Sequence, residues 1–411
     1  MKNSTQGKTV PVSDRIVAAL LLLLTSPVLL SRLLRQAIGL ADYFTEKTFH
    51  RGLFQQQDLL VYKEGGERKA PLLVEVVKGR IALVGPRLIA VDDIADAASM
   101  PFAEMHFAAT PGVFSLFELR RHTGLDFLEE QECDLEYLEN RGFGARLKIV
   151  VRSVLASAMY RTGEVMRDAA AFEVLGVRID NWSMTESLAR IARAVESRVS
   201  TTVFFANAHT LNLSYEDASF RDTLNNVDVL LPDGSGIEVA CRRQGVRRKG
   251  NINGTDMLPL LCNTLAEKGG SVFFLGGEEG IASTAARNLE KRTPGLHVAG
   301  TLNGFFDKDN CDDVIAQINA AQPDVLLVGM GQPLQERWVA QNRHRLDVPV
   351  VMAVGGLFDF YAEKVSRAPV WLRELGLEWT WRLLQEPGRM WKRYVIGNPL
   401  FLLRIRRATP R

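Results

Sequence analysis

One acidic side chain stands where a predicted strand gives way to a predicted helix. Asp233 follows an apolar run over residues 227–231, and Gly234 and a helix-forming stretch over residues 238–243 come after it. In open α/β sheets, ligands bind at the carboxyl ends of strands. Glycines let a ligand approach the backbone, and a helix start offers free N–H groups to phosphate oxygens. Asp233 is therefore a candidate ligand-binding residue; a turn that only caps the helix is the alternative.

The segments around Asp233 predict an α/β fold. From residue 172 onward, short apolar runs alternate with helical stretches, which is typical of a Rossmann-like parallel sheet with helices on both faces. The predicted strands cover residues 174–179, 202–206, 227–231, 271–275, 297–301, 325–328 and 348–354. Polar residues or glycines repeatedly follow these strands, so we expect them to line one edge of one sheet.

Several short motifs follow these strands or stand in the carboxyl-terminal part of the chain. The turn Gly276-Gly277-x-x-Gly280 is by itself a weak indicator of nucleotide binding. The other motifs are Asn207, Pro232-Asp233-Gly234, Asn253-Gly254-Thr255-Asp256, Gln335-Glu336-Arg337-Trp338, Arg367-Ala368-Pro369 and Gly376-Leu377-Glu378-Trp379, followed by Arg382 and Glu386-Pro387-x-Arg389. In their order and near-spacing they resemble the WecG/TagA/CpsF glycosyltransferases, and the resemblance covers residues 172–400.

This resemblance implies an inverting, hexosyltransferase-type enzyme that moves a sugar from a nucleotide-diphosphate donor, with UDP the expected nucleotide, to a polyprenyl-diphosphate-linked saccharide. Asp233 matches the family's proposed base, which takes a proton from the acceptor hydroxyl while the sugar–phosphate bond breaks in line. The remaining matches are expected to bind substrate: Asn207, Gly234, Asn253, Gly254, Asp256, Gly276, Gly277, Gln335, Glu336, Arg367, Arg373, Arg382 and Arg389. For Asn207 and Gln335, an amide satisfied within the protein is the alternative.

Neither a metal ion nor a cofactor is expected for this reaction. Cations and helix N-termini can stabilise the departing diphosphate. Residues 307–309 have the Asp-x-Asp spacing, but they follow an aromatic turn and are interpreted as a solvated loop. The resembling family often carries an arginine where Asn251 stands, so its best-known donors do not transfer to this chain. Arg247, Arg248 or Lys249 either substitute for that cation or form a solvated basic loop.

A hydrophobic segment over residues 16–38 predicts membrane association. Residues 16–30 are almost wholly apolar, but as a helix they reach only about 22 Å, short of the ~30 Å hydrocarbon core. Ser26-Pro27 should kink or break the helix. We therefore expect a helix that enters one leaflet and returns, held at the headgroups by Arg15, Arg32 and Arg35. A straight spanning helix and a cleaved signal peptide are the alternatives.

A second resemblance covers the region that follows. Asp14-Arg15-Ile16 leading into Ser26-Pro27, residues 76–87 with their Lys-Gly and Val-Gly-Pro-Arg elements, Pro111-Gly112 and residues 134–138 resemble the monotopic phosphoglycosyl transferases. That family needs an Asp-Glu pair just before the proline matched by Pro71, and Arg68 and Lys69 stand there instead. A cationic pair has no carboxylate to attack phosphorus or to help ligate magnesium. We interpret residues 1–165 as a degenerate, inactive relative kept as a membrane anchor or as a platform that presents lipid; retained priming activity is the alternative.

The carboxyl-terminal residues 366–411 form a basic, tryptophan-rich stretch expected to be helical. Basic residues interleaved with aromatic side chains suit an anionic membrane surface. The resemblance implies that this appendage supplies Arg373, Arg382 and Arg389 to the diphosphates, because guanidinium groups pair with phosphate in a bidentate way. Ion pairs with Glu374, Glu378 and Glu386 are the alternative.

Composition places few further limits on the 411 residues. The formal net charge of +2 gives no general indication of nucleic-acid binding, and the four cysteines form no metal-ligand pattern.

We expect a small membrane-associated α+β domain over residues 1–165, a catalytic domain over 170–365 and the appendage. The chain is expected at the cytoplasmic face of a bacterial inner membrane, in exopolysaccharide or related envelope-glycan synthesis. A non-catalytic scaffold is the non-enzymatic alternative, and self-association is left open.

Overall fold

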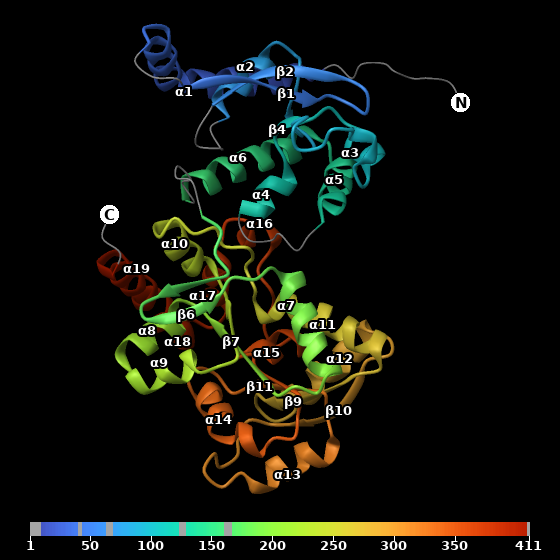
Figure 1. The fold of residues 1–411 in the computed structure, drawn as a ribbon, viewed down its shortest axis with the longest axis vertical. Helices are drawn as coiled ribbons and strands as arrows, with labels where there is room; N and C mark the ends of the chain where they lie inside the picture. The colour runs from blue at the N-terminus through green and yellow to red at the C-terminus, as the bar shows by residue number, and fades with distance from the viewer. Residues whose placement is uncertain (1–9, 40–42, 63–68, 123–128, 160–166, 409–411) are drawn as a thin grey trace. The chain divides into compact units, whose positions relative to one another are not determined.

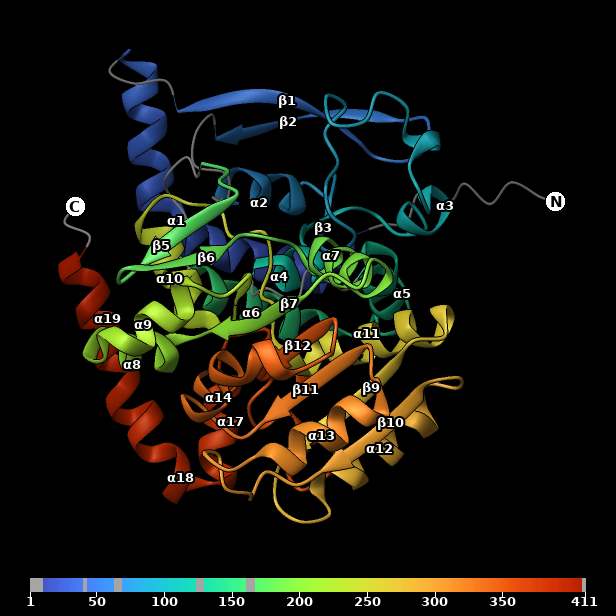
Figure 2. The same ribbon diagram turned by 60° about the horizontal axis from the view of Figure 1, so that its bottom comes forward.

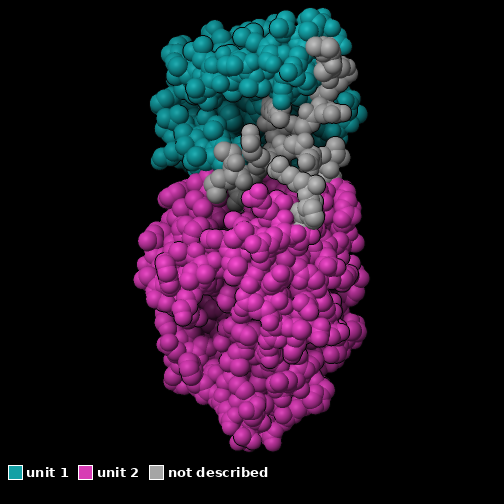
Figure 3. Space-filling model, turned by 90° about the vertical axis from the view of Figure 1, so that its left-hand side faces the viewer, with its two compact units in different colours: residues 1–165 teal, residues 166–411 magenta. Residues whose placement is uncertain are grey.

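The computed structural model describes residues 10–39, 43–62, 69–122, 129–159 and 167–408 (Figure 1). The chain divides into two compact units, residues 1–165 and 166–411, each of which has its own core (Figure 3). The tail from residue 366 onward belongs to the second unit.

The second unit is built on a six-stranded parallel sheet with the order β10-β9-β11-β12-β7-β8. The strands are β7 (Thr201–Ala206), β8 (Val229–Pro232), β9 (Ser271–Gly276), β10 (His297–Leu302), β11 (Val325–Gly329) and β12 (Val350–Ala353). Most positions of the five strands other than β10 are buried, which explains why they are near-continuous apolar runs. The predicted α/β fold and six of the predicted strands are confirmed.

Residues 174–179, predicted as one strand, are part of a hairpin. β5 (Ala171–Val174) pairs in antiparallel fashion with β6 (Val177–Asp180), and Leu175 and Gly176 between them have φ of 54° and 80°. Two positive φ values in a two-residue loop match the right-handed twist of the flanking strands. The prediction failed because it did not recognise Leu175-Gly176 as a turn.

Helices flank the sheet (Figures 1 and 2). They are α7 (Met184–Glu196), α8 (Ala208–Glu216), α9 (Ala218–Asn225), α10 (Ser235–Arg243), α11 (Gly254–Lys268), α12 (Ile281–Arg292), α13 (Asp312–Ala321), α14 (Leu334–Asn342) and α15 (Leu357–Tyr361). Several begin at side-chain caps: Asn207, Asp217 and Asn253 each accept a hydrogen bond from the first turn of the following helix.

The tail folds against the helices next to β7 and β8. It comprises α16 (Val370–Arg373), α17 (Glu378–Gln385), α18 (Pro387–Trp391), a π-helical segment (Lys392–Ile396) and α19 (Gly397–Ala408). Asn212 Nδ2 on α8 donates to the Gly397 carbonyl at 2.8 Å, and Phe401 of α19 is 1% exposed. α19 is therefore an integral part of the second unit.

The first unit combines short strands with helices. It contains α1 (Val12–Ala37), β1 (Phe44–His50), β2 (Gln56–Tyr62), α2 (Ala70–Val77), β3 (Ala82–Val84), α3 (Ala103–His106), β4 (Gly112–Phe114), α4 (Leu116–His122), α5 (Glu130–Glu139) and α6 (Phe143–Met159). Asp14 at the start of α1 is buried and pairs with Arg146 of α6 at 3.0 Å. This ion pair joins the apolar helix to the rest of the unit.

The helix does not break at Pro27, because α1 runs through it as one helix. Pro27 has no N–H, so the Leu23 carbonyl lacks its usual donor. Ser26 Oγ donates to the Leu23 oxygen at 2.9 Å instead, which satisfies that carbonyl without ending the helix. Within the described part of the chain, α1 is the one helix whose length and composition would let it cross a membrane, and Leu23 and Leu24 are 69% and 78% exposed.

Candidate active site

Asp233 and Asn207 meet at the carboxyl edge of the sheet. Ala206 and Pro232 are register partners at the ends of β7 and β8, so the next residue on each strand leaves the sheet at the same level. The Asp233 N–H donates to the Ala206 carbonyl at 2.8 Å, and Asn207 Nδ2 donates to Asp233 Oδ2 at 3.3 Å. The carboxylate is thus held in one place by backbone and side chain together.

The loop after Asp233 leaves open space beside its backbone. Gly234 has a φ of 84°, which disfavours other residues, and a Cβ there would meet no heavy atom within 4 Å. Asn251 Oδ1 accepts from the Gly234 N–H at 2.7 Å. Arg248 donates to the Gly234 carbonyl at 3.0 Å and pairs with Glu238, and its side chain is 3% exposed. The solvated-loop interpretation is therefore wrong for Arg248, because its charge is used to hold this loop.

The environment of Asp233 suits a base. Desolvation raises the pKa of its carboxyl to about 6, although the Asn207 hydrogen bond and the positive charge of Arg393 oppose that rise. A carboxyl with this pKa is ionised near neutral pH and binds a proton more strongly than an ordinary aspartate. It therefore meets the requirement for general-base catalysis.

Gln335 and Glu336 lie in the interior of the second unit and not at its surface. Both are buried, and Gln335 Oε1 accepts from the Gly355 N–H at 2.9 Å and from the Gly331 N–H at 3.2 Å. Gln335 Nε2 donates to Glu336 Oε1 at 2.8 Å. The Gln335 amide is thus satisfied within the protein, which is the alternative stated above, and it connects the loops after β11 and β12.

A second group of predicted residues surrounds the start of α11. Asn253 caps this helix and donates from Nδ2 to Asp256 Oδ2 at 2.7 Å, and Gly254 is the first helical residue. Arg367 pairs with the buried Asp256 and with Glu378, and Arg373 Nη1 lies 3.6 Å from Asp256 Oδ1. The structure brings these predicted residues into one cluster.

Arg382 and Arg389 converge on a carboxylate that the motifs did not indicate. Both lie within 3.5 Å of Asp359 Oδ2, and both pair with Glu386. The atoms nearest to a Cβ placed on Gly356 include Nη2 of each arginine, at 3.5 and 4.0 Å. The two guanidinium groups therefore lie beside the glycine loop that follows β12. The only signal for Asp359 in the sequence is its place just after that loop.

Gly276 and Gly277 allow the carboxyl ends of β9 and β11 to approach each other closely. A Cβ on Gly276 would lie 2.2 Å from the Gly329 carbonyl oxygen, and the Gly277 N–H donates to that oxygen at 3.0 Å. Gly304 in turn donates to the Gly277 carbonyl at 2.8 Å. These close contacts explain why both positions are glycine, and a bound ligand is not needed to explain them. The loop that contains the two glycines still lies at the carboxyl end of β9.

The Asp-x-Asp segment is a local turn. Asp307 accepts from the Asp309 N–H at 2.9 Å and from Asn310 Nδ2 at 2.9 Å, and both aspartates are exposed. Lys308 Nζ donates to the Gly304 and Phe306 carbonyls. The Asp307 carboxylate therefore stabilises its own loop.

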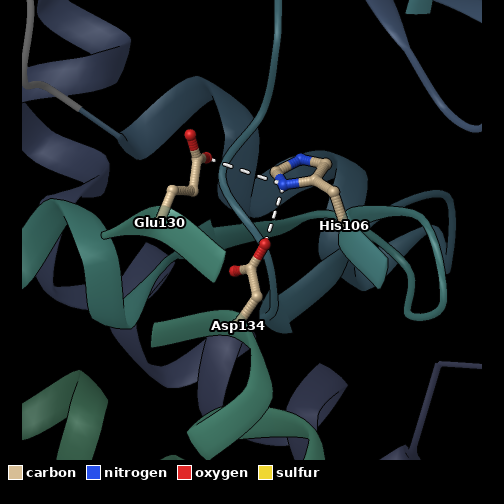
Figure 4. A group of neighbouring side chains, drawn as sticks. All are labelled: His106, Glu130 and Asp134. Carbon is tan, nitrogen blue, oxygen red and sulfur yellow. Dashed lines mark hydrogen bonds and ion pairs between the residues drawn. The ribbon is translucent and has the colours of Figure 1, made fainter. Parts of the chain in front are cut away.

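One cluster in the first unit has a composition that metal ions accept. His106, Glu130 and Asp134 present ligand atoms within 4.8 Å of one another (Figure 4). His106 Nδ1 lies 2.8 Å from Asp134 Oδ2, and His106 Nε2 lies 3.1 Å from the Arg87 carbonyl oxygen. Nε2–H can donate to the Arg87 carbonyl while Nδ1 faces the two carboxylates. The three side chains thus form a compact polar cluster inside the first unit.

The first unit also shows the surroundings of Lys69, which stands where the phosphoglycosyl transferases carry the glutamate of their Asp-Glu pair. Lys69 Nζ pairs with Glu118 at 2.6 Å and lies 5.1 Å from the centre of the Phe114 ring. Arg87 is similarly paired with Glu130 at 2.6 Å. Arg68, the other substituted position, lies outside the described residues.

Comparisons with known proteins agree with this geometry. Residues 172–411 match the family described as Glycosyl transferase WecG/TagA/CpsF, and residues 69–159 match Bacterial sugar transferase. An N-acetylglucosaminyldiphosphoundecaprenol N-acetyl-beta-D-mannosaminyltransferase from Bacillus subtilis (strain 168) is 28% identical over 211 residues, which are 51% of this chain and 81% of the relative. A protein of the same name from Staphylococcus aureus (strain MW2) is 27% identical over 253 residues, or 60% and 96%. Because the first match covers more than half of the sequence, this chain belongs to the WecG/TagA/CpsF family of glycosyltransferases.

Proposed function

We propose that the second unit transfers a sugar from a nucleotide-diphosphate donor, with UDP the expected nucleotide, to a polyprenyl-diphosphate-linked saccharide and inverts the anomeric centre. The observation that carries this proposal is the desolvated Asp233 carboxyl at the edge of the sheet, beside Asn207 and beside Gly234, where a Cβ would meet no heavy atom within 4 Å. The names of the relatives, which specify an N-acetylglucosaminyldiphosphoundecaprenol acceptor, support a lipid-diphosphate substrate of this kind.

In the proposed reaction, Asp233 takes the proton of the acceptor hydroxyl as its oxygen attacks the anomeric carbon. The bond between that carbon and the donor phosphate breaks, and its electrons leave with the nucleoside diphosphate. Arg382 and Arg389 are proposed to receive this dianionic leaving group, since guanidinium groups pair well with phosphate oxygens. Asp359 and Glu386 hold the two arginines in place before substrate arrives.

The first unit and the tail are proposed to keep the enzyme at the cytoplasmic face of a membrane, where a polyprenyl-linked acceptor resides. α1 presents large apolar side chains to its surroundings, and exposed Trp371, Trp391 and Leu384 accompany the basic residues of the tail. Arg68 and Lys69 stand where the Asp-Glu pair would be needed, which supports an anchoring role over lipid priming. The proposed pathway is the synthesis of an exopolysaccharide or related envelope glycan.

One product assay separates the candidate functions. Purified protein is offered a panel of sugar nucleotides with either polyprenyl-diphosphate-linked N-acetylglucosamine or bare polyprenyl phosphate, and the released nucleotide is identified. We expect nucleoside diphosphate, only with the lipid diphosphate acceptor, and none from an Asp233→Asn variant. Nucleoside monophosphate released with bare polyprenyl phosphate would instead identify a priming enzyme. Absence of turnover across the whole panel would favour a scaffold.

A further inference from the structure

A chain of hydrogen bonds leads from Asp233 into the interior of the second unit. It begins at Asn207, whose Oδ1 caps α8 by accepting from the His209 and Thr210 N–H groups at 3.0 and 3.1 Å. Because that oxygen is committed to the helix start, Nδ2 must point the other way. The two hydrogens of Nδ2 face Asp233 Oδ2 at 3.3 Å and Gln332 Oε1 at 3.5 Å.

Gln332 links Asn207 to a buried acid, Glu336. Its Nε2 donates to Glu336 Oε1 at 3.3 Å and to the Phe205 carbonyl at 3.3 Å. Gln332 therefore contacts both the carboxyl end of β7 and the first turn of α14. Its Oε1 accepts the second hydrogen of the Asn207 amide. No motif singled out this residue.

Glu336 forms the inner end of the chain. It is 0% exposed, and its Oε1 accepts from both Gln332 and Gln335. Among the described residues, its Oε2 has no hydrogen-bond partner. Glu336 is thus separated from solvent and from any substrate at the sheet edge, but it is two side chains away from Asp233.

We propose that Gln332 and Glu336 are positioning residues: through Asn207 they hold the Asp233 carboxylate in the orientation that accepts the acceptor proton. This inference rests on the proposed function for its catalytic consequence. It changes the role of Glu336 from substrate binding to support of the base. It also assigns a role to Gln332, which neither motif nor relative specifies.

The direction of the expected effect follows from the charges around the base. Desolvation raises the pKa of Asp233, the Asn207 hydrogen bond and the charge of Arg393 lower it, and Glu378 and Arg248 add smaller effects that raise and lower it in turn. Burial raises the pKa of Glu336 to about 7, and Arg393 opposes that rise as well. If Gln332 is lost, Asn207 is held less firmly, its hydrogen bond to Asp233 weakens, and the pKa of Asp233 rises.

The test replaces Gln332 with methionine, which keeps the volume and removes both hydrogen-bonding groups. We expect kcat to fall about fivefold to tenfold with little change in the KM for the donor. We also expect the acid limb of the kcat/KM profile to move up by roughly 0.5 to 1 pH unit. Glu336→Met removes the acceptor at Oε1 and should lower kcat as Gln332→Met does, whereas Glu336→Gln keeps that acceptor and should restore part of the activity lost in Glu336→Met. Gln317→Met, at an exposed position of α13, is the matched control and should change neither quantity. Should Gln332→Met fail to fold, Gln332→Ala carries the same expectations.

A second measurement needs no turnover. Carboxyl-labelled aspartate followed by carbon-13 NMR, with Asp233→Asn identifying the resonance, reports the pKa of Asp233 directly. A higher value in Gln332→Met than in the wild-type chain supports the inference even if the donor is still unknown. An unchanged pKa in Gln332→Met, or a Glu336→Met variant with the kcat of the wild-type chain, overturns it. If the pKa rises while the wild-type chain transfers no sugar, the proposed function fails and the positioning network stands.

Discussion

Replacing Asp233 with asparagine should remove activity and increase stability. The side chain keeps its shape, and Oδ1 of asparagine can still accept the hydrogen bond from Asn207. Loss of a general base lowers kcat by about 10²- to 10⁴-fold. Binding of the nucleotide donor should persist, because the proposed leaving-group contacts come from Arg382 and Arg389.

The gain in stability follows from the desolvated charge. The pKa of Asp233 is raised from 3.8 to about 6, and each unit of pKa corresponds to about 1.4 kcal/mol. The ionised carboxylate therefore reduces the free energy of unfolding by at most about 3 kcal/mol above pH 6. This penalty develops between the pKa of the unfolded chain and that of the folded chain, so wild-type stability should fall as the pH rises from 4 to 6. The advantage of Asp233→Asn should shrink to about 1 kcal/mol at pH 4.5.

Thermal unfolding at pH 7.5 and pH 4.5 measures this effect. We expect Asp233→Asn to melt several degrees above the wild-type chain at pH 7.5, since about 1 kcal/mol shifts the melting temperature of a unit this size by 2–4 °C. Asp309→Asn removes the same charge from an exposed turn and serves as the control. The reasoning is refuted if Asp233→Asn is no more stable than wild type at pH 7.5, or if it keeps more than a tenth of wild-type kcat.

Three further predictions concern other parts of the chain. Arg382→Lys should raise the KM for the donor roughly tenfold in steady-state assays, because lysine cannot replace a planar, two-pronged donor; an unchanged KM would exclude contact with the leaving group. Gly276→Ala should lower the melting temperature strongly, since its Cβ would lie 2.2 Å from a backbone oxygen, whereas Gly388→Ala in open space should not. Leu24→Lys should weaken vesicle binding about a hundredfold in flotation assays, since a lysine at a helix centre costs roughly 3 kcal/mol in a bilayer; undiminished flotation would place the membrane contact elsewhere.

The strands and the residues after them could be predicted because their signals are local. Strands of a parallel sheet that are covered on both faces are apolar along their length, and the residues that leave the sheet at its carboxyl edge interrupt those runs. Asp233 and Asn207 were found in this way. The hairpin around Gly176 was missed because two short strands and an unusual turn have the composition of one longer strand.

Residues without a local signal were missed or, as with Arg248, named only among alternatives. Gln332 is one polar residue in a turn, Asp359 is one acid in a short helix, and Arg248 stands in a stretch of basic residues that resembles any solvated loop. Each gains its significance from a partner far away in the sequence, such as Asn207 for Gln332, Arg382 and Arg389 for Asp359, and Gly234 for Arg248. Composition does not indicate such pairs.

Hydrophobic periodicity and motif spacing act over a few positions, so the amino-acid sequence alone predicted most of the succession of strands and helices along the chain, the apolar amino-terminal helix and the set of residues available for chemistry. Which of those residues meet depends on how distant segments pack. The register that pairs Ala206 with Pro232 brings Asn207 beside Asp233, and the docking of the tail gives Arg382 and Arg389 a shared carboxylate. These contacts depend on strand order and on packing between distant segments, which no local pattern specifies.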